Sequence, residues 1–249
     1  MRFLKSCLFF LTLILAACSQ PLQFTQAPTP QTLRIAYLSS LSPLTEFLQI
    51  CISEQTDSYF VLEEIPTLPT ANQADLTIWL GEKPTSFAFA YPFGWEQLSV
   101  VVNPKNSLEN LTVDDIRLIF SGKIDNWNAL TSEDRPVSVW VYPEDYEIQR
   151  QFSRFLGGDL QTTSLAYLAS SPAIVGEAIA SDPGAIGILP NAWINAGLTP
   201  IQLETDSLTL PILALSSIDP PAAAREFIAC LQSPQFQAAM KTRYQPWKK

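Results

Sequence analysis

The chain has 249 residues with 24 acidic and 15 basic side chains, a formal net charge of −9, and no histidine. The lack of histidine excludes Ser-His-Asp triads, Cys-His dyads and histidine-ligated metals. The acidic charge disfavours nucleic acid as a partner, because there is no excess of cations to release counterions.

Composition and motifs point to a globular protein without a bound cofactor. Hydrophobic residues make up 47% of the chain and charged residues 16%, a globular balance. The four cysteines are widely spaced, which argues against a zinc knot or an iron–sulfur cluster. Neither GxGxxG nor GxxxxGKS/T occurs in the sequence, so the common phosphate loops are missing. We expect no cofactor, no metal and no catalytic residue.

The first eighteen residues have the pattern of an export signal. Arg2 and Lys5 precede a short apolar run, residues 7–15, which is too short for a comfortable membrane span. Residues 15–18 (LAAC) then place small side chains before a cysteine. This arrangement looks like a bacterial lipobox. The alternative is an ordinary secretory signal with a chance cysteine.

The lipobox predicts an extracytoplasmic protein held at the cell membrane by lipid. Residues 1–17 would be the signal peptide and Cys18 the lipidation site. Residues 18–32 are rich in Pro, Gln and Thr and read as a tether. Acyl chains on Cys18 would anchor the protein without spanning the bilayer.

The remaining cysteines suggest a disulfide. If Cys18 carries lipid, the mature chain keeps only Cys51 and Cys230. In an oxidising compartment two such residues suggest a Cys51–Cys230 bond. Two buried free thiols are the alternative.

Strand and helix patterns alternate along the rest of the chain. Ser42 and Pro43 predict the N-cap and first residue of a helix, Thr112 opens a capping-box pattern, and Gly157-Gly158 ends a helix around residues 148–156. Further helices are expected from Ser171-Pro172, from Asp219-Pro220 and from Ser233-Pro234 to about Tyr244. Strands are expected over residues 33–38, 60–65, 75–80, 98–103, 137–142, 185–189, 201–204 and 208–215. This alternation predicts an α/β fold with mostly parallel sheets, and the length suits two lobes.

A family resemblance lies between these elements. Residues 103–106 (NPKN), 110–112 (NLT), 119–124 (IFSGKI) and 126–127 (NW) form a string similar to one in the phosphate-binding proteins of ABC importers, the periplasmic type 2 family. Residues 183–187 (PGAIG) resemble a downstream element of the same family. The string itself is expected to be scaffold, with Phe120 and Trp127 in the core.

The resemblance implies a two-lobed periplasmic-binding-protein-like fold (type 2). Such a fold has mixed, mostly parallel sheets with flanking helices and two crossover strands. Lobe 1 would be residues 33–98 plus 206–249, and lobe 2 residues 99–205. The arrangement places Cys51 and Cys230 in one lobe, which supports the disulfide. The resemblance also implies a monomer that holds a small polar or anionic solute in the interlobe cleft and docks on an ABC permease.

Part of the expected ligand site follows from the resemblance. Ser39, Ser40, Leu41 and Ser42 lie between the first strand and its helix, where the family has its first ligand loop. Hydroxyls and free backbone N–H groups are neutral donors that capture oxyanions. Gly81 and Glu82 follow the 75–80 strand, at the second loop.

The third part of the family pattern is missing. An SGT sequence should stand before Phe152, but the chain has Tyr146, Glu147 and Ile148 there. Glu144, Asp145 and Glu147 cluster at this helix start, where carboxylates satisfy the helix dipole and repel phosphate. Tyr142 and Tyr146 are candidates to stack on a ring or to bond a polyol. Their alternative role is packing.

Three functions therefore compete. The first is a solute-binding lipoprotein of an ABC importer, phosphate-binding-protein-like, with an oxyanion or another small polar solute as ligand. The second is a non-transporting scaffold or sensor on the same fold that has lost phosphate binding. The third is an enzyme with paired carboxylates, such as Glu82 with Glu144 or Asp145; we expect no enzyme.

Overall fold

The computed structural model describes residues 30–70, 73–158, 161–203 and 208–247. The predicted signal peptide, the lipidation site at Cys18 and the tether up to residue 29 lie outside these ranges. None of the helices within the described ranges is both long and apolar enough to cross a bilayer. Residues 31–249 form one unit by their contacts.

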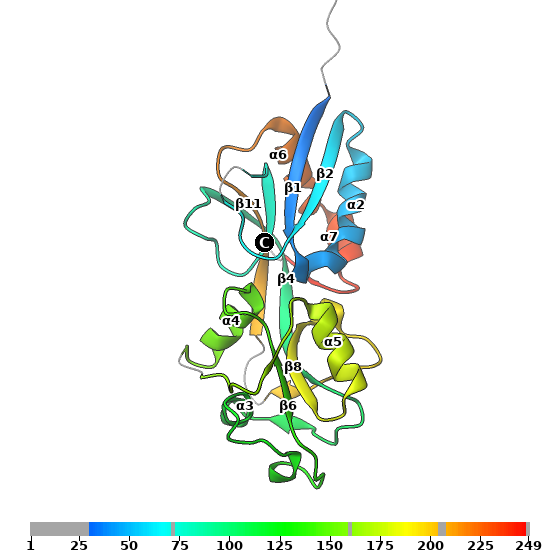
Figure 1. Ribbon diagram of the computed structural model, residues 1–249. Helices are drawn as coiled ribbons and strands as arrows, with labels where there is room; N and C mark the ends of the chain where they lie inside the picture. The colour runs from blue at the N-terminus through cyan, green and yellow to red at the C-terminus, as the bar shows by residue number, and fades with distance from the viewer. Residues whose placement is uncertain (1–29, 71–72, 159–160, 204–207, 248–249) are drawn as a thin grey trace, which may run out of the picture. The chain divides into compact units, whose positions relative to one another are not determined.

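Strands and helices alternate through most of this unit (Figure 1). The helices are α2 (Thr45–Glu54), α3 (Val113–Phe120), α4 (Glu147–Phe155), α5 (Pro172–Ser181), α6 (Ala222–Leu231) and α7 (Pro234–Met240), with short 3₁₀ helices η1 (Ser39–Leu44), η2 (Trp127–Ala129) and η3 (Asn191–Trp193). The strands are β1 (Gln31–Leu38), β2 (Ser58–Ile65), β3 (Leu76–Leu80), β4 (Phe89–Val102), β5 (Asn110–Leu111), β6 (Ser138–Val141), β7 (Tyr167–Leu168), β8 (Ala185–Pro190), β9 (Thr199–Pro200), β10 (Gln202–Leu203), β11 (Leu208–Ser216) and β12 (Gln245–Pro246).

One mixed sheet connects most of the strands, in the order β2-β1-β3-β11-β4-β8-β6-β7. Strands β2, β1 and β3 are parallel to one another, and so are β8, β6 and β7. We call these two groups the β1 end and the β8 end of the sheet. Between them, β11 and β4 pair antiparallel with their neighbours, so the sheet is parallel at its ends and antiparallel in its middle.

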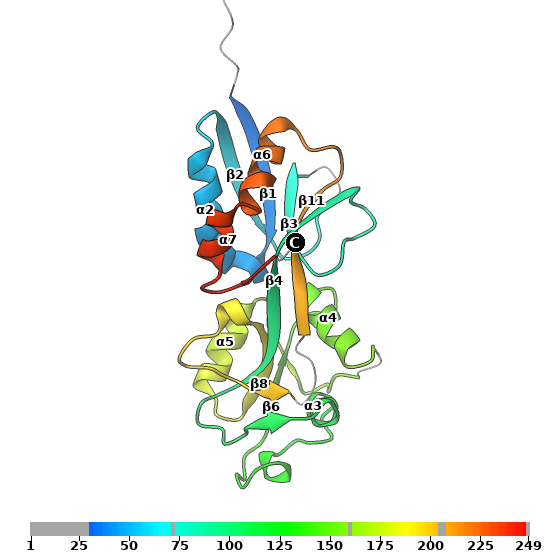
Figure 2. The ribbon, with the colours of Figure 1, turned by 180° about the vertical axis from the view of Figure 1, so that it is seen from behind.

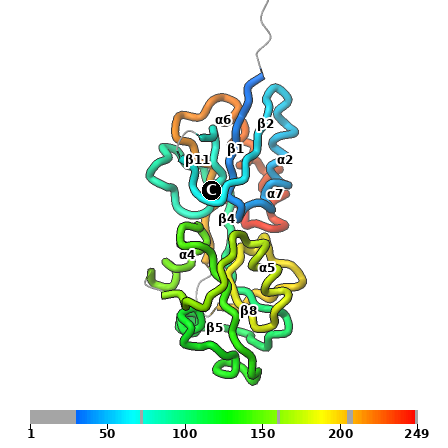
Figure 3. Tube along the Cα trace, in the orientation of Figure 1, coloured from blue at the N-terminus to red at the C-terminus, as the bar shows by residue number. Residues whose placement is uncertain are grey.

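Strand β4 links the two ends (Figure 3). Its residues 89–98 pair with β11, and residues 98–102 pair with β8. Leu98 therefore marks the change of partner, since it lies opposite both Leu208 and Pro190. The predicted division into two lobes at residues 98/99 and 205/206 stays a proposal.

Helices α2, α6 and α7 lie together on the β1 end (Figure 2). A disulfide joins Cys51 of α2 to Cys230 of α6, in agreement with the predicted pairing. Phe227 and Phe236 are fully buried where these helices meet the sheet. The bond therefore connects two helices that share one apolar core although 179 residues separate the cysteines.

Local helix signals were partly confirmed. Thr112 caps α3 in a capping box with Asp115, and Gly157 has the left-handed φ of +99° that ends α4. The expectation for Ser42 was wrong: the turn begins at Ser39, and the Ser42 hydroxyl donates to the Ser39 carbonyl instead of capping a helix. The reason is that Leu41 and Leu44 of this turn are both buried, so packing sets its start.

The last two helices also differ from the expectation. Helix α6 begins at Ala222, after Pro220-Pro221, and not at Asp219. A proline disfavours helical backbone in the residue before it, so the helix starts only beyond the second proline. Helix α7 ends at Met240, four residues before the expected end.

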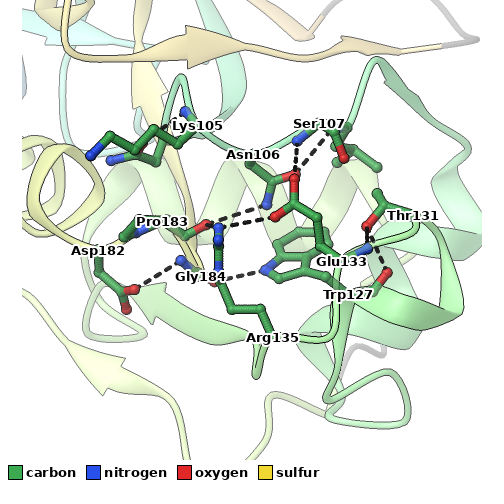
Figure 4. Close-up of polar contacts among 12 residues, drawn as sticks. Lys105, Asn106, Ser107, Trp127, Thr131, Glu133, Arg135, Asp182, Pro183 and Gly184 are labelled. Carbon is green, nitrogen blue, oxygen red and sulfur yellow. Dashed lines mark hydrogen bonds and ion pairs between the residues drawn. The ribbon is translucent and has the colours of Figure 1, made fainter.

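The motifs that carried the resemblance meet at the β8 end and form scaffold (Figure 4). The fully buried Trp127 donates its indole N–H to the Gly184 carbonyl at 3.0 Å. Glu133 accepts from the Ser107 amide at 2.9 Å and pairs with Arg135 at 3.0 Å. The hydrogen bonds from Ser107, followed by the charge of Arg135, hold the pKa of Glu133 below its usual value. These contacts fix loops to one another.

Candidate functional site

The candidate site lies where three strands end. Ser39 and Ser40 follow β1, Gly81 follows β3, and Tyr146 and Glu147 follow the turn after β6. Ligands of open α/β sheets bind beyond the carboxyl ends of the strands. We call this place the junction, formed by Ser39, Ser40 and Gly81 from the β1 end and by Tyr146, Glu147 and Gln151 from the β8 end.

Ser39 and Tyr146 connect the two sides of the junction directly. Their hydroxyl oxygens are 2.7 Å apart and share a buried hydrogen bond. Burial raises the pKa of Tyr146 above its usual value, and the hydrogen bond to Ser39 acts in the opposite direction. Tyr146 therefore stays a neutral phenol that can donate or accept.

Ser40, the next residue after Ser39, has an unused hydroxyl. Its carbonyl accepts the indole N–H of Trp193 at 2.7 Å, a second bond between the two sides. The residue is 2% exposed, and Oγ has no hydrogen-bond partner among the described residues. Buried polar atoms are nearly always bonded, so this oxygen is a candidate ligand group. The neighbouring Leu41 is fully buried in the core.

Gly81 is required by its conformation and by its neighbours. It has φ +99°, and a Cβ there would lie 2.8 Å from Gln151 Nε2 and 3.1 Å from Glu147 Oε1. Only glycine fits both conditions. The next residue, Glu82, is exposed and forms a long ion pair of 3.8 Å with Arg154. The structure therefore brings Gly81 to the junction and leaves the Glu82 carboxylate in solvent.

Glu147 is the buried charge of the junction. It is the first residue of α4 and its side chain is 6% exposed. Arg150 donates to its Oε2 from both Nε and Nη2, and Gln151 Nε2 donates to Oε1 at 2.6 Å. The carboxylate is thus held by a two-point charge-assisted pair and a further hydrogen bond.

Tyr142 packs inside the β8 end. Its ring stacks on Tyr146 with centroids 4.9 Å apart, and its hydroxyl donates to the Ile188 carbonyl at 2.9 Å. Burial, followed by the proximity of Tyr146, raises the pKa of Tyr142 well above its usual value. In this position Tyr142 supports the Tyr146 ring.

Glu144 and Asp145 are exposed in the turn before α4. Glu144 lies at the rim of a cavity of about 470 Å³ beside α4, which Arg150, Arg154 and Thr162 also line. Within the described ranges no group of three or more Asp, Glu, Cys or His side chains is placed to hold a metal ion. The acidic cluster seen in the sequence therefore separates into one buried residue, Glu147, and two solvated ones.

Gln151 of the junction, and Trp193, which bonds to Ser40, were not expected as site residues. Gln151 is polar, but it lies three residues after Ile148 and four before Phe155, a spacing that places it on the buried face of α4. Trp193 follows β8 by three residues. Its position just after a buried strand could have marked it as a site residue, because the indole N–H of a buried tryptophan needs a hydrogen-bond partner.

Comparison with protein families shows which family the chain belongs to. The family described as the PBP superfamily domain matches residues 81–219, more than half of the sequence. The chain belongs to the PBP superfamily. The match includes Gly81, Tyr146 and Glu147 of the junction but begins after Ser39 and Ser40.

The relatives of this PBP superfamily member include phosphate-binding proteins. The phosphate-binding protein PstS of Bacillus subtilis (strain 168) is 24% identical over 159 residues, 58% of this chain and 52% of the relative. The chain thus matches about half of the length of that curated relative.

Solved structures show the same fold. A putative phosphate ABC transporter substrate-binding protein with bound phosphate from Clostridium perfringens superposes with a TM-score of 0.80 at 14% identity, covering 88% of this chain and 100% of that one. An ABC-type phosphate transport receptor from Vibrio cholerae gives a TM-score of 0.69 at 18% identity, over 85% and 98%. The predicted PBP-like fold and the resemblance to the type 2 phosphate-binding proteins of ABC importers are confirmed.

Proposed function

We propose that this PBP superfamily member is an extracytoplasmic solute-binding lipoprotein that delivers a small polar solute to an ABC permease. The solute would bind at the junction between lobe 1 (residues 33–98 plus 206–249) and lobe 2 (residues 99–205). The protein would act as a monomer, anchored to the membrane by lipid on Cys18. Binding, and not catalysis, is the activity that its relatives support.

The observation that carries this proposal is the convergence of hydroxyls at the strand ends. The Ser39 and Tyr146 hydroxyls meet from segments 107 residues apart in sequence, and Ser40, the next residue after Ser39, has a buried hydroxyl. The unpartnered Ser40 Oγ needs a hydrogen-bond partner that the described residues do not supply. A polar solute would satisfy it.

Entry of a solute requires the two sides to separate. The Ser39–Tyr146 and Trp193–Ser40 bonds both cross the junction, so opening must break them. Strands β4 and β11 connect the two sides, and bending there would move one against the other as a hinge. A solute that contacts both sides at once would favour the closed form.

The test is native mass spectrometry of protein purified without denaturation. We expect a small polar molecule in the spectrum that disappears after unfolding. Ser40→Ala should weaken its retention, whereas Ser170→Ala, an exposed control, should not. If no molecule co-purifies and no solute in a broad panel raises the melting temperature, the solute-binding proposal is wrong and a scaffold or sensor role takes its place.

A further inference from the structure

The start of α4 is a place where an anion is attracted. The first backbone N–H groups of a helix have no partner within the helix, and the helix dipole adds positive potential there. Tyr146, the N-cap residue, makes no side-chain capping bond. A free oxyanion would therefore be drawn to this point if nothing else held negative charge.

Glu147 already places a negative charge there. Its carboxylate belongs to the first residue of the helix and is almost fully buried. It also takes up the nearest cation, because Arg150 directs Nε and Nη2 to it. Arg154, the next arginine on α4, lies 3.8 Å from Glu82 and is largely exposed. The two arginines that could attract an oxyanion are thus unavailable, because Arg150 is bound to a carboxylate and Arg154 is largely exposed to solvent.

An independent observation concerns the hydroxyls of the segment after β1. Among the residues that the structure describes, the buried Ser40 hydroxyl has no partner, and the hydroxyls of Ser39 and Tyr146 bond only to each other. Hydroxyls both donate and accept, so they suit a solute hydroxyl or amine as well as an anion. The charge of Glu147 therefore decides which of these ligands can bind.

We infer that Glu147 is a specificity-determining residue that excludes free oxyanions from the junction, so that the solute is a neutral polyol or an amine. A phosphate beside the buried carboxylate would meet a like charge at short range in a poorly hydrated site, which is strongly unfavourable. A hydroxyl or ammonium group would instead donate to Glu147. This inference rests on the proposed solute-binding function.

The test is calorimetric titration of inorganic phosphate into the full chain and into two matched variants. Glu147→Gln removes the buried charge and frees Arg150, whereas Glu144→Gln removes an exposed charge three residues away. We expect no measurable phosphate binding by the wild type or by Glu144→Gln. Glu147→Gln should bind phosphate measurably, at least about tenfold more tightly than the weakest binding that the titration detects, as one additional charge-assisted contact implies.

The outcomes separate this inference from the proposed function. Micromolar phosphate binding by the wild type, or no gain in Glu147→Gln over Glu144→Gln, overturns the inference. If circular dichroism shows that Glu147→Gln is unfolded, Glu147→Ser, which keeps a small polar side chain at the helix start, is titrated with the same expected gain. The variant could bind phosphate while the wild type binds no solute at all. That result would support the exclusion of phosphate by Glu147 and would reject the proposed solute-binding function.

Discussion

The hydroxyl oxygens of Ser39 and Tyr146 lie 2.7 Å apart although 107 residues separate them in the chain. Ser39 follows a strand of the β1 end, and Tyr146 precedes a helix of the β8 end. Their hydrogen bond can therefore form only when the two sides of the junction are in contact. It is also buried, so water does not compete for it.

Tyr146→Phe should lower the free energy of unfolding by about 1 kcal/mol, the usual net value of one hydrogen bond, and by more if Ser39 is left unbonded. The ring, and its stacking on Tyr142, would be kept. Urea titration followed by circular dichroism gives the value. Tyr167→Phe, at an exposed tyrosine, serves as the control, and equal stabilities of the two variants would show that the Ser39 bond contributes nothing.

Loss of the Cys51–Cys230 bond should destabilise the fold by about 2–5 kcal/mol, as is typical for a native disulfide. The bond closes a separation of 179 residues, and in its absence the unfolded chain gains freedom. Wild-type protein should unfold at lower urea concentration in the presence of a reductant. The double variant Cys51→Ser/Cys230→Ser should unfold at that lower concentration with or without reductant; a wild type insensitive to the reductant would contradict the role of the bond.

Stability should fall as the pH rises, because of Glu96 on β4. This side chain is 1% exposed and its Oε2 has no partner among the described residues. Burial raises its pKa from 4.5 to about 8, and backbone N–H groups of Gln97, Ala192 and Asn191 oppose the shift. Burial, followed by the charge of Glu96, also raises the pKa of the buried Tyr244. The folded protein therefore keeps Glu96 protonated where the unfolded chain has lost the proton.

The sign of the effect follows from this difference. Below pH 4.5 both states bind the Glu96 proton and the contribution of this residue to stability is largest. Between pH 4.5 and about 8 the unfolded state binds fewer protons, so this contribution declines by on the order of 5 kcal/mol. Above pH 8 the contribution is lost. Unfolding measured at several pH values should show a smaller decline in Glu96→Gln than in the wild type or in the exposed control Glu109→Gln. Parallel profiles for all three proteins would exclude Glu96 as the cause.

Trp127→Phe should destabilise the protein by about 1 kcal/mol, because the buried Gly184 carbonyl loses one of its two donors and keeps the Ser138 N–H. Solute binding should stay unchanged, since Trp127 belongs to the scaffold of the β8 end. Chemical unfolding and titration of the co-purifying solute provide the two readouts. Trp140→Phe, at a partly buried tryptophan, is the control, and a loss of solute affinity confined to Trp127→Phe would place this residue in the site.

Where the signal was local, the sequence predicted the elements well. The capping box at Thr112 and the glycine stop after α4 depend on residues within one helical turn. Strand β4 shows the limit: the expected strand began at Leu98, but the observed one begins at Phe89. Pro92, Gly94 and Glu96 break the pattern of a strand, and only pairing with β11, with a register shift at Ile212/Leu213, makes the segment extended.

By itself the sequence determined the α/β alternation, the family resemblance and the loops that carry Ser39 and Gly81, because each rests on short patterns of residue type. The structure decided between a Cys51–Cys230 disulfide and two free thiols. Only the tertiary structure decided which of the polar residues are buried. Glu144, Asp145 and Glu147 look alike in the sequence, yet Glu147 alone is enclosed, because Arg150, Gln151 and Gly81 surround it. Burial of a charge depends on partners supplied by the fold, and those partners cannot be identified from the charged residue itself.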